Sequence, residues 1–375
     1  MILVDSFLAG CSVVCCFHLE AKQYGTLSWK RKEFTVNGLK ILRRIGVAAV
    51  CILSSGTHLL KAQGAATGLK KSVLQTVADV PLPGPAVRFD YQSLDTGNER
   101  LYIAHMNADH LVVFSTAKRQ VTANLDGFTR VHGVIAVPEI DRVYASATGK
   151  HEVIAVEAKT LKIVGSGGPI VYPDGLAYAP TVKRVFVSDE HGGVDAVIDA
   201  QTNRMIASIP LGGGAGNTVY DAGSNRILVA VHGVNELVAI DPESLQVVGR
   251  YRLPGIENPH GIALDPEHRL AFIAGEENHS LTAFDLNTMK ELSVQSVGDD
   301  PDVLAFDSGL GILYVAAESG TVTVLRESRR ELHQMGQITL PHAHTVAVDP
   351  RTHLVYFPLE NIDGHPLLRI MRPTE

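Results

Sequence analysis

The sequence is poor in the residue types that would mark several common functional classes. Aromatic residues make up 6% and charged residues 19% of the 375 residues, and the formal net charge is −7. An acidic chain of this kind lacks a basic surface that neutralises phosphate groups, so we expect no nucleic-acid partner. The hydrophobic content of 45% is enough for a large core and too high for a disordered chain.

Cysteine and tryptophan are confined to the first 51 residues. The four cysteines are Cys11, Cys15, Cys16 and Cys51, and the single tryptophan is Trp29. The remainder of the chain therefore uses no disulfide, no thiolate nucleophile and no cysteine metal ligand. Because no tryptophan follows Trp29, any repeats in the remainder of the chain are not of the Trp-Asp type in sequence.

A short apolar phrase recurs along the chain at a nearly constant interval, most clearly as Gly-Ile-Ala-Leu-Asp-Pro at 261–266. Its copies begin at residues 91, 133, 175, 218, 261, 303 and 345, so the spacings are 42, 42, 43, 43, 42 and 42 residues. A fixed period of roughly 40–45 residues with four short strands is typical of a β-propeller blade. The sequence therefore predicts an all-β fold, a seven-bladed β-propeller with four-stranded blades over residues 73–375.

The fifth copy shows the expected strands most clearly. Alternating apolar residues separated by turn residues predict strands over 260–265, 269–275, 280–285 and 290–297.

The last copy is one strand short. It contains predicted strands at 345–349, 354–358 and 366–370, and then the chain stops. Residues 74–83 match the outer-strand phrase of the third copy, at 205–212. We therefore expect the N-terminal strand to complete the last blade and close the ring, which leaves only short, protected sheet edges.

Several of these phrases resemble the YVTN-type repeats of the YncE-like propeller family. The similar pieces are 185–189, 197–203 and 206–212, and the resemblance covers about residues 73–375. The Tyr-Val-Thr-Asn tetrad is never intact, and Tyr102-Ile-Ala-His105 is one of the nearest forms. The resemblance implies the propeller fold and says little about activity, because propellers host many functions.

Residues 1–70 are expected to form a leader in which 39–62 looks like a secretory signal peptide. A basic stretch at 40–44 precedes the apolar run 45–53, and Ala62 is a small residue at the expected cleavage point. The apolar run is shorter than the about 20 residues that a membrane-spanning helix needs. We expect a periplasmic or secreted protein, monomeric and without an integral membrane span after cleavage.

Residues 1–35 precede this segment, although a signal peptide normally stands at the N-terminus. One hypothesis is that translation begins at Val36 and that 1–35 is untranslated. The alternative is a disordered extension. Leu8-Ala9-Gly10-Cys11 spells a lipoprotein cleavage box, but it lacks a preceding basic region.

The residue just before each repeat phrase is polar in all seven copies. These residues are Asp90, His132, Asp174, Asn217, His260, Asp302 and His344. In a propeller these turns surround the mouth of the central channel, so we expect a ring of imidazoles and carboxylates there. A second polar set follows the second strand of most blades and is expected to reach the same mouth. It comprises His105, Glu190, His232, Glu276, Glu318 and Glu360.

Two interpretations of this ring remain open. Imidazole nitrogen and carboxylate oxygen suit a divalent ion such as zinc, with His132, His260 and His344 as the imidazole ligands. Repetition in every blade is also what a structural role predicts, in which each side chain bonds to the adjoining blade and fixes a loop.

The sequence contains no nucleophile elbow, no phosphate-binding glycine loop and no His-Glu-x-x-His. We therefore expect a non-catalytic, exported binding protein that uses the channel mouth for a small ligand, a metal ion or an envelope protein. The first alternative is a metal-dependent hydrolase of the lactonase type, with Glu190, Glu276, His260 and His344 as ligands or bases. The second is a redox or copper-binding propeller, suggested by the number of histidines.

Overall fold

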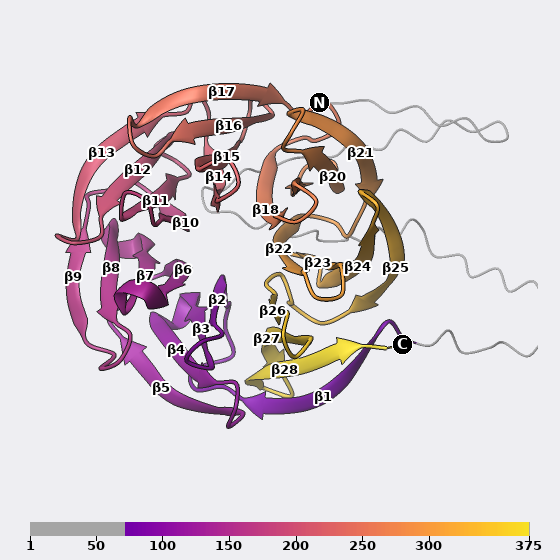
Figure 1. Ribbon diagram of the computed structural model, residues 1–375. Helices are drawn as coiled ribbons and strands as arrows, with labels where there is room; N and C mark the ends of the chain where they lie inside the picture. Colours follow the sequence, from indigo (N-terminus) through magenta and orange to yellow (C-terminus); the bar gives the residue numbers. More distant parts are fainter. Residues whose placement is uncertain (1–71, 375) are drawn as a thin grey trace, which may run out of the picture. The chain divides into compact units, whose positions relative to one another are not determined.

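The computed structural model describes residues 72–374, which form seven four-stranded antiparallel sheets around a central channel (Figure 1). The described residues contain no α-helix, only three 3-10 turns at Met106–Ala108, Pro138–Ile140 and Thr148–Lys150. The predicted all-β, seven-bladed propeller is confirmed. The predictions for residues 1–70 lie outside the described residues.

The blades are numbered in chain order, and each runs from the channel outwards. Blade 1 has β2 (Gln92–Asp95), β3 (Arg100–His105), β4 (His110–Ser115) and β5 (Gln120–Asp126); blade 2 has β6 (Val131–Val137), β7 (Arg142–Ala147), β8 (Glu152–Glu157) and β9 (Ile163–Gly167). Blade 3 has β10 (Pro173–Ala179), β11 (Arg184–Asp189), β12 (Val194–Asp199) and β13 (Arg204–Pro210); blade 4 has β14 (Ala215–Asp221), β15 (Arg226–Val231), β16 (Glu236–Asp241) and β17 (Gln246–Arg252). Blade 5 has β18 (Pro259–Asp265), β19 (Leu270–Gly275), β20 (Ser280–Asp285) and β21 (Lys290–Ser296); blade 6 has β22 (Pro301–Asp307), β23 (Ile312–Ala317), β24 (Thr321–Ser328) and β25 (Glu331–Thr339).

Blade 7 combines the two ends of the described chain, as predicted. Its order is β26 (Ala347–Asp349), β27 (Leu354–Ile362), β28 (His365–Pro373) and then β1 (Leu74–Pro81). β1, in indigo, lies beside β28, in yellow (Figure 1), and the two strands pair antiparallel from Leu74 opposite Pro373 to Pro81 opposite Leu367. The ring is therefore closed by backbone hydrogen bonds.

Burial follows the position of a strand in its blade. The middle strands are buried on both faces, as in β19, whereas outer strands such as β21 alternate exposed and half-buried residues. Apolar side chains from adjacent blades pack into shared clusters: Phe272 of blade 5 lies in one cluster with Val315 and Leu325 of blade 6. Each blade therefore depends on its neighbours for its core.

The turn between the first and second strands ends the same way in every blade. Its last residue adopts a left-handed backbone conformation, with φ between 51° and 64°, at Glu99, Asp141, Lys183, Asn225, Arg269, Gly311 and His353. In blade 5 the turn is capped by Asp265, whose Oδ1 accepts hydrogen bonds from the backbone nitrogens of Glu267 and His268 at 3.1 and 3.2 Å. Side chains at this turn position therefore hold equivalent places at successive blade junctions.

Candidate functional site

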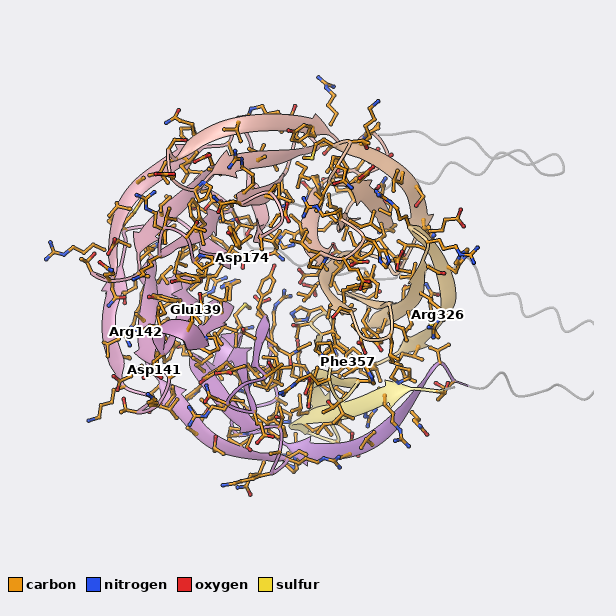
Figure 2. All side chains as sticks on the ribbon, in the orientation of Figure 1. Glu139, Asp141, Arg142, Asp174, Arg326 and Phe357 are labelled. Atoms are coloured by element: carbon orange, nitrogen blue, oxygen red, sulfur yellow. The ribbon has the colours of Figure 1, made fainter. Side chains whose placement is uncertain are left out.

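A cavity of about 330 Å³ opens at one end of the central channel and is lined by five of the seven blades. Six of the thirteen lining residues are Asp or Glu, against two Arg and two His, so the cavity is polar and predominantly acidic. Figure 2 shows Asp174, one of these residues, at the inner end of its blade beside the channel. The lining residues are Arg88, Asp90, Tyr91, Met106, Arg130, His132, Tyr172, Asp174, Glu190, His260, Glu276, Asp302 and Glu318.

In blades 2 to 6 the ring residue lies in a bulge at the start of the innermost strand, whereas Asp90 and His344 precede β2 and β26. In blade 5 Pro259 pairs with Gly275, and the next pair is Ile262 with Ile273, so His260 lies in an interrupted stretch of ladder. A bulge of this kind turns a side chain away from the regular alternation of a strand. All seven predicted ring residues are buried, with exposed fractions from 1% to 9%. The structure therefore brings the predicted ring to the channel, although not every member lines the cavity.

Glycine follows several ring residues because the innermost strands approach one another closely. A Cβ atom at Gly133 would lie 2.0 Å from the carbonyl oxygen of Asp174, and one at Gly261 would lie 1.9 Å from that of Asp302. No side chain fits these distances, which explains why these two copies of the repeat phrase begin with glycine.

His260 is the centre of the first cluster of candidate metal ligands. Its Nδ1 lies 3.3 Å from Asp302 Oδ1 and 3.6 Å from Glu276 Oε1, and its Nε2 lies 3.6 Å from Asp174 Oδ2. One donor atom each from His260, Glu276 and Asp302 can be chosen so that all three lie within 4.8 Å of one another. This mixed nitrogen and oxygen donor set suits a divalent cation.

A second cluster shares Asp302 with the first. Asp90, Asp302 and His344 also bring donor atoms within 4.8 Å of one another, and all three are buried. His344 Nε2 lies 3.9 Å from Asp90 Oδ1. Asp302 therefore stands between two groups of donors and can contribute to either.

The carboxylates in this cavity carry like charges and repel one another. Burial, together with the nearby Asp174 and Asp302, raises the pKa of Asp90 well above its usual value. Burial opposes ionisation of Asp302 too, but interaction with His260 outweighs it and lowers the pKa of Asp302. Burial likewise disfavours the His260 imidazolium, but Asp174 and Asp302 outweigh it and raise the pKa of His260. In the protein alone, protons on Asp90 and His260 thus reduce the repulsion among the crowded carboxylates.

Several buried polar atoms at the channel make no hydrogen bond within the described part of the chain. They are Asp174 Oδ1, His260 Nδ1, Asp302 Oδ1 and His344 Nε2. A buried polar group without a partner costs about 1–3 kcal/mol. His260 Nδ1 and Asp302 Oδ1 come from adjoining blades and attract each other at 3.3 Å, but neither meets the geometry of a hydrogen bond. Side chains that only fixed loops would be expected to form well-aligned hydrogen bonds to the adjoining blade. The arrangement therefore favours ligand binding over a purely structural role.

His132 differs from the other two ring histidines. Its Nδ1 lies 2.8 Å from the carbonyl oxygen of Arg130, and its Nε2 lies 3.1 Å from the hydroxyl of Tyr172. Because a carbonyl only accepts, Nδ1 carries the proton and Nε2 accepts from Tyr172. Burial lowers the pKa of His132 and keeps the ring neutral. Both nitrogens already have partners, and His132 belongs to neither cluster of candidate ligands.

Three further predicted residues, like His344, do not line the cavity. The ring of His232 is 5.3 Å from that of His260, and burial lowers the pKa of His232 to about 4. Asn217 packs against Gly175, where its Oδ1 would lie 2.2 Å from a Cβ atom. Glu360 Oε2 lies 3.8 Å from His342 Nδ1.

The placement of His105 at the mouth requires correction. His105 is fully buried and stacks on Phe89 with ring centroids 4.0 Å apart, and it does not line the cavity. It is the last residue of β3, whereas Glu276 and Glu318 come one residue after the end of β19 and β23. The true counterpart of these glutamates in blade 1 is Met106, which does line the cavity. A shift of one residue along a strand moves a side chain to the opposite face.

Sequence reasoning missed Arg88, Arg130 and Tyr172, which also line the cavity. Each stands two residues before a ring residue. Residues two apart in an extended segment share a face, so this spacing was the available signal. Arg88 is paired with Glu318, at 2.6 Å between Nη2 and Oε1.

The fold is similar to that of several solved propellers. The Kuenenia stuttgartiensis hydrazine synthase chain matches with a TM-score of 0.66 and 14% identity, over 80% of this chain and 98% of that one. The WD40 repeats of RRP9 match with a TM-score of 0.67 and 9% identity, over 80% and 100%. U3-55K matches with a TM-score of 0.67 and 9% identity, over 79% and 98%.

These similarities show the fold alone, because the sequence identities are low. The blades are thus WD40-like in architecture, although the repeats lack the Trp-Asp signature. Neither a protein-family model nor a curated protein matches the sequence.

Proposed function

We propose that this protein is a binding propeller whose channel mouth holds a divalent cation between His260, Glu276 and Asp302. The observation that carries the proposal is the group of buried donor atoms that converge on the channel and have no hydrogen-bond partner in the described residues. A cation would give these atoms a partner and would separate the negative charges that otherwise repel one another. The propeller fold is consistent with a binding or scaffold role.

The charge of the cavity supports a cation more strongly than an anion. Its carboxylates outnumber its arginines by six to two, and Arg88 is already paired with Glu318. Binding of a cation to His260 would displace the proton from the coordinating nitrogen, so metal uptake should release protons to the solvent.

The cavity also leaves room for a further ligand. The cavity volume of about 330 Å³ is several times the roughly 30 Å³ that one water molecule occupies in the liquid. The cavity can therefore hold more than a single ion. Arg130 stands at the same opening and can donate to an oxygen of a small polar ligand, whereas the Tyr172 hydroxyl already donates to His132. The ion and Arg130 together would select a small molecule with anionic or carbonyl oxygens.

The direct test is elemental analysis of the full chain, purified without a metal-affinity tag. The first 71 residues contain four cysteines, so bound metal is compared between variants. We expect His260→Gln and Asp302→Asn each to lose about one equivalent of divalent metal relative to the wild type. His333→Gln, at an exposed histidine of blade 6, is the control and should retain it. Equal metal content in all four proteins would refute the proposal.

A metal-dependent hydrolase is the second candidate, and the position of Glu190 favours it. Its carboxylate lines the cavity, its side chain is 28% exposed, and its nearest ion-pair partner is His191 at 4.0 Å. A carboxylate free of short contacts beside a cation can accept the proton of an activated water. The metal-loaded protein should then hydrolyse simple lactones, and Glu190→Gln should abolish turnover without loss of metal. A metal-loaded wild type that leaves a lactone panel intact would exclude this candidate. The redox or copper alternative stays a prediction.

The YncE-like assignment and export belong to the same proposal. The repeat phrases support the family, and the signal-like segment 39–62 supports a periplasmic or secreted location. In residues 72–374 no helix has the length and apolar character needed to cross a bilayer. Fractionation of the source cells and N-terminal sequencing should find an exported chain beginning at Gln63. A cytosolic chain that retains residues 39–62 would contradict export.

A further inference from the structure

Three successive blade junctions lie at the ends of the innermost strands opposite the ring residues, and they differ in the group that pairs with the capping aspartate. At the junction of blades 4 and 5, Arg269 pairs with Asp221 through two contacts of 2.5 and 2.8 Å. At the junction of blades 6 and 7, His353 Nδ1 lies 2.9 Å from Asp307 Oδ2. In both cases the left-handed turn residue of one blade supplies a nitrogen group to the capping aspartate of the preceding blade.

The junction between them, of blades 5 and 6, lacks this nitrogen group. The turn residue there is Gly311, which has no side chain to offer to Asp265. A cavity of about 260 Å³ lies at this place, lined among others by Asp265, His268 and Glu327. Asp265 and Glu327 are 1% and 6% exposed, so two buried carboxyl groups flank the cavity. The position that holds a guanidinium or an imidazole at the neighbouring junctions is thus open to a ligand.

Donor atoms of three residues converge here. His268 Nδ1 lies 2.8 Å from Asp265 Oδ2 and 3.3 Å from Glu327 Oε2. All three chosen donor atoms lie within 4.8 Å of one another. Two ligand atoms bound tetrahedrally to zinc at 2.0–2.2 Å stand about 3.3–3.5 Å apart. The contact to Glu327 already has this spacing, and the contact to Asp265 needs to open by about half an ångström.

One carboxylate oxygen of Glu327 is left without a hydrogen bond by residues 72–374. Its Oε1 accepts from the backbone nitrogen of Arg330 at 2.7 Å. Its Oε2 has His268 Nδ1 as its neighbour, but the single proton on that nitrogen is directed to Asp265. The Glu327 side chain is only 2% exposed, and this oxygen lies 3.3 Å from His268 Nδ1, within the cluster.

We propose that Asp265, His268 and Glu327 form a second divalent-cation site, of the zinc type, at the junction of blades 5 and 6. The cation replaces the proton of His268 Nδ1, binds one oxygen of each carboxylate and completes its coordination with water, since the His268 side chain is 42% exposed. Glu267 adds negative charge to the cavity and Arg329 adds positive charge. The ion performs the task that Arg269 and His353 perform at the adjoining junctions, which is to join consecutive blades.

This site is separate from the channel mouth and can be tested separately. The full chain, freed of metal with a chelator, is titrated with Zn²⁺ alone and followed by calorimetry, with Co²⁺ absorption as an independent report of nitrogen and oxygen ligation. We expect Glu327→Gln to lose one equivalent of bound zinc relative to the wild type. Glu267→Gln, a carboxylate of the same cavity outside the three ligands, is the matched control and should retain it. His260→Gln at the mouth should also retain this equivalent.

Gly311→Arg provides a second and opposite test. The turn accepts arginine, because Arg269 holds the equivalent position at φ 55° and Gly311 has φ 64°. The new Cβ would lie 3.0 Å from the carbonyl oxygen of Glu327, so a shift of a few tenths of an ångström is needed. The guanidinium should occupy the cation position, so the variant should bind one equivalent less zinc and should lose the part of the zinc-induced rise in Tm that this site contributes.

The proposal is overturned if Glu327→Gln binds zinc with the stoichiometry and affinity of the wild type. A folded Gly311→Arg protein that keeps the full zinc response would overturn it as well. If Gly311→Arg does not fold, the comparison of Glu327→Gln with Glu267→Gln still decides. Loss of zinc from His260→Gln alone would support the mouth site and contradict this one.

Discussion

Replacing Asp195 by asparagine should make the protein more stable above neutral pH and leave it unchanged in acid. Asp195 is fully buried in β12, at a place where blades 4 and 5 carry Leu237 and Leu281. Its Oδ1 accepts a hydrogen bond from the Val187 backbone at 2.9 Å, and its Oδ2 accepts from the Thr218 hydroxyl at 3.1 Å. Burial outweighs these bonds and raises its pKa from 3.8 to about 7.

The magnitude follows from the two pKa values. Between pH 4 and pH 7 the carboxyl is protonated in the folded protein and ionised in the unfolded chain, so the folded state binds more protons. The unfolding free energy therefore falls as the pH rises through this window. A pKa of about 7 against 3.8 corresponds to a loss of roughly 4 kcal/mol. Asparagine keeps both hydrogen bonds, because its amide can donate to Thr218, and it carries no charge at any pH.

The assay is denaturant unfolding, followed by circular dichroism, of wild type and Asp195→Asn at pH 4, 6 and 8. The difference between the two proteins should be near zero at pH 4 and should grow to roughly 4 kcal/mol in favour of the variant at pH 8. Other titrating groups are common to both proteins and cancel in this difference. Asp363→Asn, at an exposed turn, is the control and should show no such trend. A difference that is the same at pH 4 and pH 8 would refute the reasoning.

Three further predictions concern the contacts between blades and the closure of the propeller. Gly261→Ala should prevent folding or lower Tm by more than 10 °C in a thermal melt, because its Cβ would lie 1.9 Å from the Asp302 carbonyl; a shift of only a few degrees would contradict the close approach. Arg269→Met should cost about 3 kcal/mol in denaturant unfolding, since it leaves the 3%-exposed Asp221 carboxylate without its cationic partner, and Asp221→Asn in the same protein should restore part of that loss. Deletion of residues 72–81 removes β1 and exposes the edge of blade 7, so light scattering should detect oligomers that the full chain does not form.

The fold was predictable because a propeller repeats one pattern seven times. A period near 42 residues, turn residues such as Asp265-Pro266 and the short last copy together indicated the blade number and its closure. The predicted strand boundaries in blade 5 differ from the structure by at most one residue; the second strand, for example, begins at Leu270 and not at Arg269. Periodicity carries this information because each blade must bury the same apolar faces against its neighbours.

The candidate site was predictable only in part. The ring positions could be identified because the seven turns are equivalent, but the pattern does not show which side chains reach the cavity. His105 and Met106 illustrate this, since one residue decides between the core and the mouth. The cluster around Glu327 was invisible in the sequence for a different reason. It depends on Gly311 lacking the side chain that Arg269 and His353 have. The consequence of that difference can be recognised only when the blade junctions are compared in the structure.

The central claim is that the channel mouth binds a divalent cation through His260 and Asp302. Its most direct measurement is anomalous diffraction at the zinc absorption edge from crystals of the full chain grown with Zn²⁺. The account predicts an anomalous peak about 2.0–2.2 Å from a nitrogen of His260 and an oxygen of Asp302. A map with zinc peaks elsewhere and none at the mouth would contradict it, and the unpartnered donors there would then require a ligand of another kind.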